Sequence, residues 1–322
     1  SGKLAYFHVK TVRSNLMQFS TTAINVLILF LYFIPGYILI KTKAVKEDQI
    51  KAFAKVLLYV CQPCLSIYSF QKASYSLELV KNMGIFVGLN IALMLIVLFG
   101  CYLALRKKYD DCRNRILTLA ATFGNVGFIG IPLLEALLPD NPEVIAYNAV
   151  FIVAMNVMSW TLGFFILTDD KKYFHPKKIF LNPPVLSLLV SLPLFFTGTT
   201  LPTVLGNGIG LLGKMTTPLC MMIAGMRFAT SDIKALFTEP RVYIASALKL
   251  IAMPLFAFLA VNWLPVDYPI KATMVILCAC PTASLVLNFA EVYGDGQKTA
   301  SYTVLASTIF SMLTIPLVLL IL

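Results

Sequence analysis

The stretch 116–138, ILTLAATFGNVGFIGIPLLEALL, limits most strongly what this chain can fold into. It is apolar and long enough to cross a bilayer, which takes about 20 residues. Its middle nevertheless holds three glycines and Pro132, which are poor helix formers. In hydrocarbon every backbone group needs a hydrogen-bond partner, so an interrupted helix survives only where protein or a water-filled cavity surrounds it. The stretch is therefore either a kinked packing helix or a discontinuous helix that builds a substrate site.

The composition is that of a polytopic membrane protein. Of 322 residues, 59% are hydrophobic and only 13% are charged, about half the charged fraction of a soluble domain. The net charge of +11 does not indicate nucleic acid, because the basic residues lie between apolar spans and form no aromatic-lined basic face. The seven cysteines lie mostly within those spans, where they serve as small packing residues rather than as disulfides or metal ligands. We expect no metal site and no cofactor.

Ten apolar spans follow one another, which predicts an all-α protein with ten transmembrane helices. We expect them at about 21–40, 50–70, 84–105, 116–138, 144–167, 184–196, 211–229, 242–264, 270–292 and 300–322. Residues 1–20 are amphipathic and are expected to lie along the membrane surface. The polar segment 168–183 is expected to link a first five-helix repeat, 21–167, to a second, 184–322.

The prolines of the two halves recur at similar intervals. They fall in spans one, two and four and again in spans six, seven and nine, as Pro35, Pro63, Pro132, Pro193, Pro218 and Pro281. Because five is an odd number of spans, the second repeat must be inverted relative to the first. Inverted repeats with interrupted helices in matching positions point to a transporter's binding site. This pattern favours the discontinuous reading of 116–138.

Lysine and arginine in the connections predict the orientation of the chain in the membrane. The one-two, three-four, five-six and seven-eight connections hold more lysine and arginine, counted together, than the other connections. Cytoplasmic loops carry such an excess. We therefore expect a multi-pass protein of the cell membrane with the five-six linker in the cytoplasm and both termini outside.

If spans four and nine are both interrupted near their prolines, two half-helices begin at the bilayer centre, near 131–132 and near 282–284. Each beginning offers unpaired N–H groups and a positive dipole end, which suit a carboxylate. Neutral amides and hydroxyls nearby would bind an anion and then release it. The predicted substrate-binding residues are Asn125, Gly127, Gly130, Pro132, Pro281, Thr282, Ser284 and Asn288. For Asn288, hydrogen bonding between helices is an equal alternative.

Ionisable residues within spans are costly and mark functional sites by default. Lys249, inside span eight, is a candidate countercharge for an anion or a proton-linked switch, although its long stem also allows it to reach the membrane interface. Glu135 and Glu291 are further candidates near the ends of spans four and nine. Three other polar residues of the spans are interpreted as packing contacts: Asn90, Asn148 and Asn156.

The residue inventory argues against an enzyme. Both histidines, His8 and His175, lie outside the spans, and no aspartate lies within one. No Walker A sequence is present, so the chain is not a self-contained ATP-driven pump.

Two motifs resemble those of a known family. Asn125 followed by Gly130-Ile131-Pro132-Leu133-Leu134 resembles the NxxxxGIPLL of auxin efflux carriers. Phe289-Ala290-Glu291-x-Tyr293, followed by a final span with Pro316, resembles their FAKEYN segment and last helix. The resemblance covers nearly the whole chain, which lacks a long central loop and so looks like a prokaryotic-type relative of the plant PIN-type carriers. At positions 290–292 the chain has Ala-Glu-Val in place of Ala-Lys-Glu, so no role of that lysine transfers.

The resemblance implies a bile-acid-symporter-like fold of two inverted five-helix repeats, with spans four and nine crossing at their prolines. It also implies transport of organic anions such as malate, malonate or indole-3-acetate, by an elevator-like movement of a crossover domain, in a homodimer. Two alternatives remain open. One is a sodium-coupled symporter of the bile-acid type, and the other is a metabolite receptor that binds without net flux.

Overall fold

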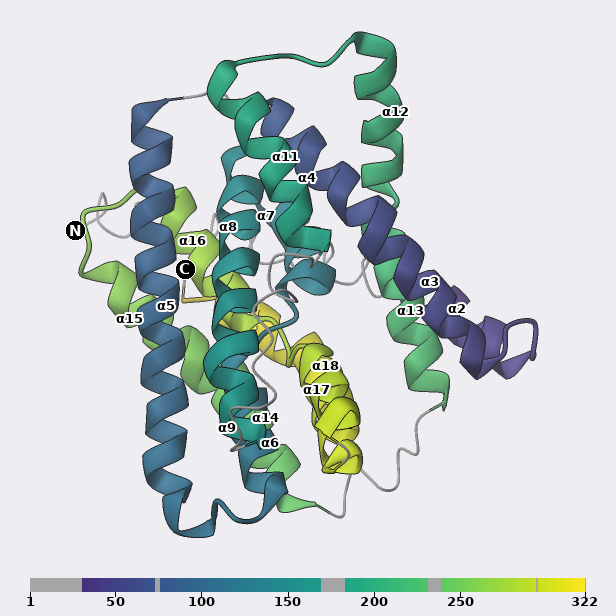
Figure 1. Ribbon diagram of the computed structural model, residues 1–322, viewed down its shortest axis with the longest axis vertical. Coiled ribbons are helices and arrows are strands. Elements are labelled where there is room, and N and C mark those ends of the chain that lie inside the picture. Colours follow the sequence, from purple (N-terminus) through teal and green to yellow (C-terminus); the bar gives the residue numbers. More distant parts are fainter. Residues whose placement is uncertain (1–30, 73–75, 169–182, 231–238, 294, 322) are drawn as a thin grey trace, which may run out of the picture.

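The computed structural model describes residues 31–72, 76–168, 183–230, 239–293 and 295–321, and every regular element among them is helical (Figure 1). This agrees with the expected all-α membrane protein. The predicted amphipathic segment 1–20, the first half of the first span and nearly all of the 168–183 linker lie outside the described residues.

The first half of the chain holds long helices joined by short turns. Its elements are α2 (Phe33–Lys41), η1 (Glu47–Gln49), α3 (Ile50–Val56), η2 (Leu57–Cys61), α4 (Gln62–Lys72), α5 (Leu77–Leu105), η3 (Arg106–Lys108), α6 (Cys112–Thr122), η4 (Val126–Gly130), α7 (Ile131–Leu137), α8 (Glu143–Met158), η5 (Ser159–Gly163) and α9 (Phe164–Thr168). The third span begins earlier than expected because Ser76 accepts the N–H of Leu79 and so caps α5.

The second half is built in the same way. It contains α11 (Pro183–Thr197), α12 (Thr203–Lys214), α13 (Thr216–Thr230), α14 (Pro240–Ala247), η8 (Leu248–Ala252), α15 (Met253–Asn262), α16 (Tyr268–Ala279), α17 (Leu285–Tyr293) and α18 (Gln297–Leu319). The predicted seventh span covers only part of α12 and α13, which together run from 203 to 230 with a joint at Met215.

Within the described residues, six helical stretches are long and apolar enough to cross a membrane: 47–68, 77–108, 143–168, 203–230, 240–262 and 297–319. Predicted spans four and nine are absent from this set because each is divided into two shorter helices, α6 and η4–α7 in one case and α16 and α17 in the other. The described residues thus show a polytopic membrane protein in which two apolar stretches are discontinuous.

Most prolines within the helices do not interrupt them. Pro63, Pro132 and Pro254 are each the second residue of an α-helix that directly continues a π-helical turn, namely η2, η4 and η8. A π turn widens the helix by one residue, which makes room for a ring that would otherwise clash with the preceding turn. The chain therefore passes these prolines as a bent but continuous helix.

The helices form two groups, as Figure 1 shows. The outer group consists of α2, α3 to α4, α11, α12 and α13, where α13 packs on α2 and both α11 and α12 pack on α4. The crossover group consists of α5 to α9 and α14 to α18. Within the outer group, a methyl group on Gly36 or Gly225 would overlap the backbone carbonyl of Met222 or Phe33. Small residues thus let α2 and α13 touch backbone to backbone.

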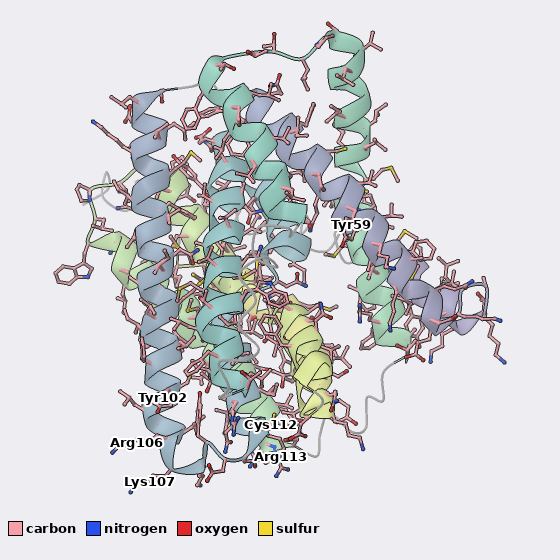
Figure 2. The ribbon with its side chains drawn as sticks, viewed as in Figure 1. Tyr59, Tyr102, Arg106, Lys107, Cys112 and Arg113 are labelled. Atoms are coloured by element: carbon pink, nitrogen blue, oxygen red, sulfur yellow. The ribbon has the colours of Figure 1, made fainter. Side chains whose placement is uncertain are left out.

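One end of the crossover group is polar. Arg106 and Lys107 of η3, directly after α5, and Arg113 at the start of α6 gather there (Figure 2). Asp111 accepts from both Arg113 and Arg241, at 2.9 Å each, which ties α6 to α14. The hydrogen bond from Arg113 is the largest of the influences that hold the pKa of the Asp111 carboxyl below its usual value.

Candidate functional site

The two discontinuous spans cross and pair through their unwound backbones. α6 ends at Thr122 and Phe123 is extended, while α16 ends at Ala279 and Cys280 is extended. Gly124 and Thr282 then form an antiparallel β-bridge. Through these contacts, backbone groups that the interrupted helices cannot satisfy find partners inside the protein.

Two backbone hydrogen bonds and the Thr282 side chain hold the crossing together. The N–H of Asn125 donates to the Pro281 carbonyl at 2.6 Å, and the N–H of Ala283 donates to the Phe123 carbonyl at 2.9 Å. The Thr282 hydroxyl donates to the carbonyl of Ala120 at 3.0 Å. The predicted binding residue Thr282 is therefore a structural element of the crossing, whatever else it contacts.

The interruption of span four lies elsewhere than expected. We expected the second half-helix to begin near Ile131-Pro132, but it begins at Val126 and is continuous through η4 and α7. Pro132 is buried inside this half-helix, and Gly124-Asn125 is the unwound point. In span nine the expected position was right, because Pro281 lies in the unwound segment.

Lys249 lies against the crossing. It belongs to η8 of span eight, is only 1% exposed, and its Nζ donates to the carbonyl of Cys278 at 3.2 Å. A methyl group on Gly124 would lie 2.9 Å from this Nζ. The side chain thus does not reach the membrane interface, and the absence of a side chain at position 124 lets the ammonium approach the unwound backbone.

The other predicted substrate-binding residues surround the crossing to different extents. Gly130 is buried against Leu277, and Gly127 is half-buried against Gln62. Ser284 is half-buried and lies directly before α17, whereas Asn288 is exposed one turn further along. The structure therefore brings together residues 124–130 with 280–284, and leaves Asn288 at the periphery.

Of the two predicted glutamates, Glu135 does not join the crossing. Glu135 is exposed, and its Oε2 accepts from the hydroxyl of Thr217 at 3.2 Å, which connects α7 to α13. Glu291 belongs to α17, and its side chain lies outside the described part of the chain.

Two buried amides near span four escaped the sequence-based selection. Gln62 is 6% exposed and Asn148 is 1% exposed. Among the described residues, neither Nε2 of Gln62 nor either end of the Asn148 amide has a hydrogen-bond partner. The sequence-based interpretation treated both Asn90 and Asn148 as packing contacts. It fits Asn90 better, because the Asn90 amide donates to the Phe151 carbonyl at 3.3 Å. One feature of the sequence could have singled out Gln62: it is a polar residue that directly precedes Pro63 within an apolar span.

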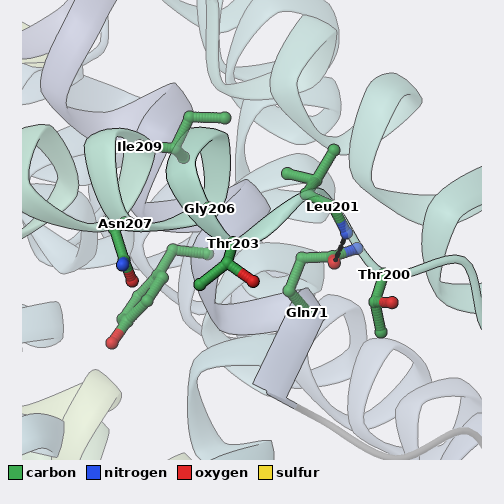
Figure 3. A pocket seen from close by; sticks show the side chains of 8 residues that line it. Gln71, Thr200, Leu201, Thr203, Gly206, Asn207 and Ile209 are labelled. Carbon is green, nitrogen blue, oxygen red and sulfur yellow. Dashed lines mark hydrogen bonds between the residues drawn. The ribbon is translucent and has the colours of Figure 1, made fainter.

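A separate small cavity of about 200 Å³ lies at the end of α4, where the turn between α11 and α12 passes over it (Figure 3). Gln71 fixes this turn, since it donates to the Thr199 carbonyl at 2.9 Å and accepts from the N–H of Leu201 at 2.8 Å. The amide of Gln71 is thus satisfied by backbone groups, in contrast to that of Gln62.

Crossed discontinuous helices in a polytopic membrane protein are the architecture of a secondary transporter. The sequence pattern of the family described as "Membrane transport protein" matches residues 21–319, and the chain belongs to this family, that of the auxin efflux carriers.

Similar proteins support the same class. An uncharacterised transporter of Methanocaldococcus jannaschii is 25% identical over 306 residues, which cover 91% of this chain and 96% of the relative. An uncharacterised transporter of Escherichia coli K12 is 22% identical over 299 residues, with 88% and 91% covered. A Rhizobium meliloti protein named "Putative malonate transporter" is 27% identical over 204 residues, with 61% and 63% covered.

Proposed function

We propose that this chain is a secondary transporter of small organic anions that binds its cargo where the two discontinuous spans cross. The binding residues in this proposal are Asn125, Gly127, Gly130, Pro281 and Ser284, with Lys249 as the fixed countercharge. The half-helices that begin at Val126 and Leu285 add N–H groups and positive dipole ends, which favour a carboxylate.

The observation that carries the proposal is the side-chain nitrogen of Lys249, which is buried beside the crossing. Among the described residues, no ion pair reaches Lys249. A buried charge without a partner of opposite sign is costly, and an anionic ligand would compensate it. An anion at the crossing would therefore gain both a countercharge and the dipoles of two helices.

The two groups of helices suit an elevator movement. In the proposal the crossover group carries the anion past the outer group, whose helices are held by close glycine contacts. The finer architecture remains part of the proposal: ten spans in two inverted repeats, 21–167 and 184–322, both termini outside, the 168–183 linker in the cytoplasm, and a homodimer.

Two alternatives differ in what they require at the crossing. A sodium-coupled symporter would hold a cation there, and the ammonium of Lys249 opposes a second positive charge at short range. A receptor would bind the anion without carrying it. The relative named for malonate, together with the family resemblance, makes malonate, malate and indole-3-acetate the first cargo candidates.

Flux through purified protein in proteoliposomes tests the proposal. Radiolabelled malonate, malate and indole-3-acetate are offered in turn, with an imposed proton or sodium gradient, and Asn125→Ala liposomes serve as the matched control. We expect saturable uptake of at least one anion that is lost in Asn125→Ala and does not require sodium.

Other outcomes choose between the alternatives. Uptake that depends on a sodium gradient would establish the symporter. Saturable binding without flux under any gradient would establish the receptor. Equal uptake by wild type and Asn125→Ala would remove the crossing from the transport path.

A further inference from the structure

The amide of Gln62 is a buried donor at the contact between the two groups of helices. Gln62 is the first residue of α4 in the outer group, and a methyl group on Gly127 of the crossover group would lie 3.0 Å from its Nε2. This Nε2 is buried and has no hydrogen-bond partner in the part of the chain that the structure describes. An unpaired buried amide is destabilising, so its presence here calls for a compensating ligand.

Asn148 adds a second unpaired amide close to the same part of span four. It is one helical turn from Ile152 on α8, so the two residues share a face. A methyl group on Gly127 would lie 3.7 Å from Cδ1 of Ile152. Neither the oxygen nor the nitrogen of the Asn148 amide has a partner among the described residues.

Two kinds of polar group therefore lie along the unwound segment and η4: an amino group and an amide. Lys249 meets Gly124, whereas Gln62 meets Gly127, three residues further on. The Lys249 amino group and the Gln62 amide thus lie against positions three residues apart on one short segment of span four. A ligand bound at this segment would have a polar group of each kind beside it.

We propose that Gln62, assisted by Asn148, binds a second polar group of the cargo, so that the site selects short dicarboxylates over monocarboxylates with an apolar remainder. This inference rests on the proposed function and narrows its substrate class. One carboxylate is held at the crossing beside Lys249, and the other accepts from the Gln62 amide when the two groups of helices separate enough to admit it. An anion with an apolar end leaves the amides unpaired, and a site of this kind rejects such analogues strongly.

Ligand pairs that differ only in the second carboxylate test the proposal on the purified full chain. Malonate is compared with propionate, and succinate with butyrate, by equilibrium binding and by thermal melting. For Gln62→Leu we expect the dicarboxylate affinity to fall about 10- to 100-fold, the loss of one hydrogen bond to a charged group. The monocarboxylate affinity should change little, and the melting temperature without ligand should rise because an unpaired amide is removed. Asn148→Leu should change all three quantities in the same directions.

Gln71→Leu is the matched control, because Gln71 lies on the same helix with its amide paired to backbone groups. It should lower the melting temperature and leave the ratio of the two affinities unchanged. An unchanged ratio in Gln62→Leu, or equal wild-type affinities for malonate and propionate, would overturn the inference while anion transport stands. Binding of indole-3-acetate alone would overturn the inference while anion transport stands, and binding of neither indole-3-acetate nor any of the four anions would overturn the proposed function together with it.

Discussion

Replacement of Lys249 by methionine isolates the charge at the crossing. Methionine has a similar length and is apolar, so it fills the space beside Gly124 and removes only the ammonium. An ammonium and a carboxylate about 4 Å apart interact by about 4 kcal/mol at an effective dielectric constant of ~20. Some of this is offset by the desolvation of the incoming anion. The net loss of binding free energy should be about 2–4 kcal/mol, which corresponds to about 30- to 1,000-fold in the dissociation constant.

The same substitution should not weaken the fold. Lys249 is 1% exposed and no described residue pairs with its charge, so methionine should leave the melting temperature equal or higher. Titration calorimetry in detergent with the best transported anion measures the affinity, and a melting curve of the same sample measures stability. Lys214→Met is the control, since Lys214 is exposed at the end of α12, with its Nζ 5.9 Å from the Tyr68 ring centre.

An unchanged dissociation constant in Lys249→Met would refute the assignment of the countercharge. A large drop in melting temperature with normal affinity would make Lys249 a structural residue whose bond to the Cys278 carbonyl matters for folding. An equal loss of affinity in Lys214→Met would indicate a general effect of net charge rather than a specific contact.

Three further predictions concern the frame around the site. Thr282→Val should destabilise the protein by about 1 kcal/mol, because it removes a buried hydrogen bond to α6; Thr282→Ser should retain the wild-type melting temperature. Gly225→Val should prevent assembly of α13 on α2, measured as loss of monodisperse protein, whereas Gly100→Ala, with nothing within 4 Å of the added methyl group, should be neutral. Asp111→Asn should lower the melting temperature at neutral pH, because Arg113 lowers the pKa of Asp111 in the folded state and the stability it contributes is present above the ordinary carboxyl pKa. The difference between Asp111→Asn and wild type should shrink as the pH falls through the lowered pKa; a difference that persists unchanged at acid pH would contradict this assignment.

The sequence located the discontinuous span four but misplaced its interruption. Proline removes a backbone donor, so Pro132 was taken as the break. In the structure a π turn before the proline absorbs its ring, as it does before Pro63 and Pro254. The chain unwinds at Gly124-Asn125, where a neighbouring span supplies backbone partners. Such partners come from a segment over 150 residues away in sequence, as the pairing of Gly124 with Thr282 shows, and local propensity cannot reveal them.

The candidate site was also predictable only in part, because it too depends on contacts between segments distant in the sequence. Polarity within an apolar span identified Asn125, Thr282 and Lys249, because such residues are costly in a membrane. It could not distinguish Asn288, which is exposed, from Gln62, which is buried at the contact between the two groups. Which helix faces the crossing depends on how the two groups of helices pack. That packing follows from glycine contacts between segments distant in the sequence, such as the contact of Gly36 in α2 with Met222 in α13.

A structure with a heavy-atom analogue of the cargo tests the central claim most directly. Bromosuccinate, a dicarboxylate with one strong scatterer, is soaked into crystals of the transporter, and its anomalous signal gives the position of the bound anion. We predict a single peak at the crossing, in contact with Asn125 and near Lys249, that disappears in Lys249→Met. A peak in the cavity beside Gln71, with none at the crossing, would contradict it.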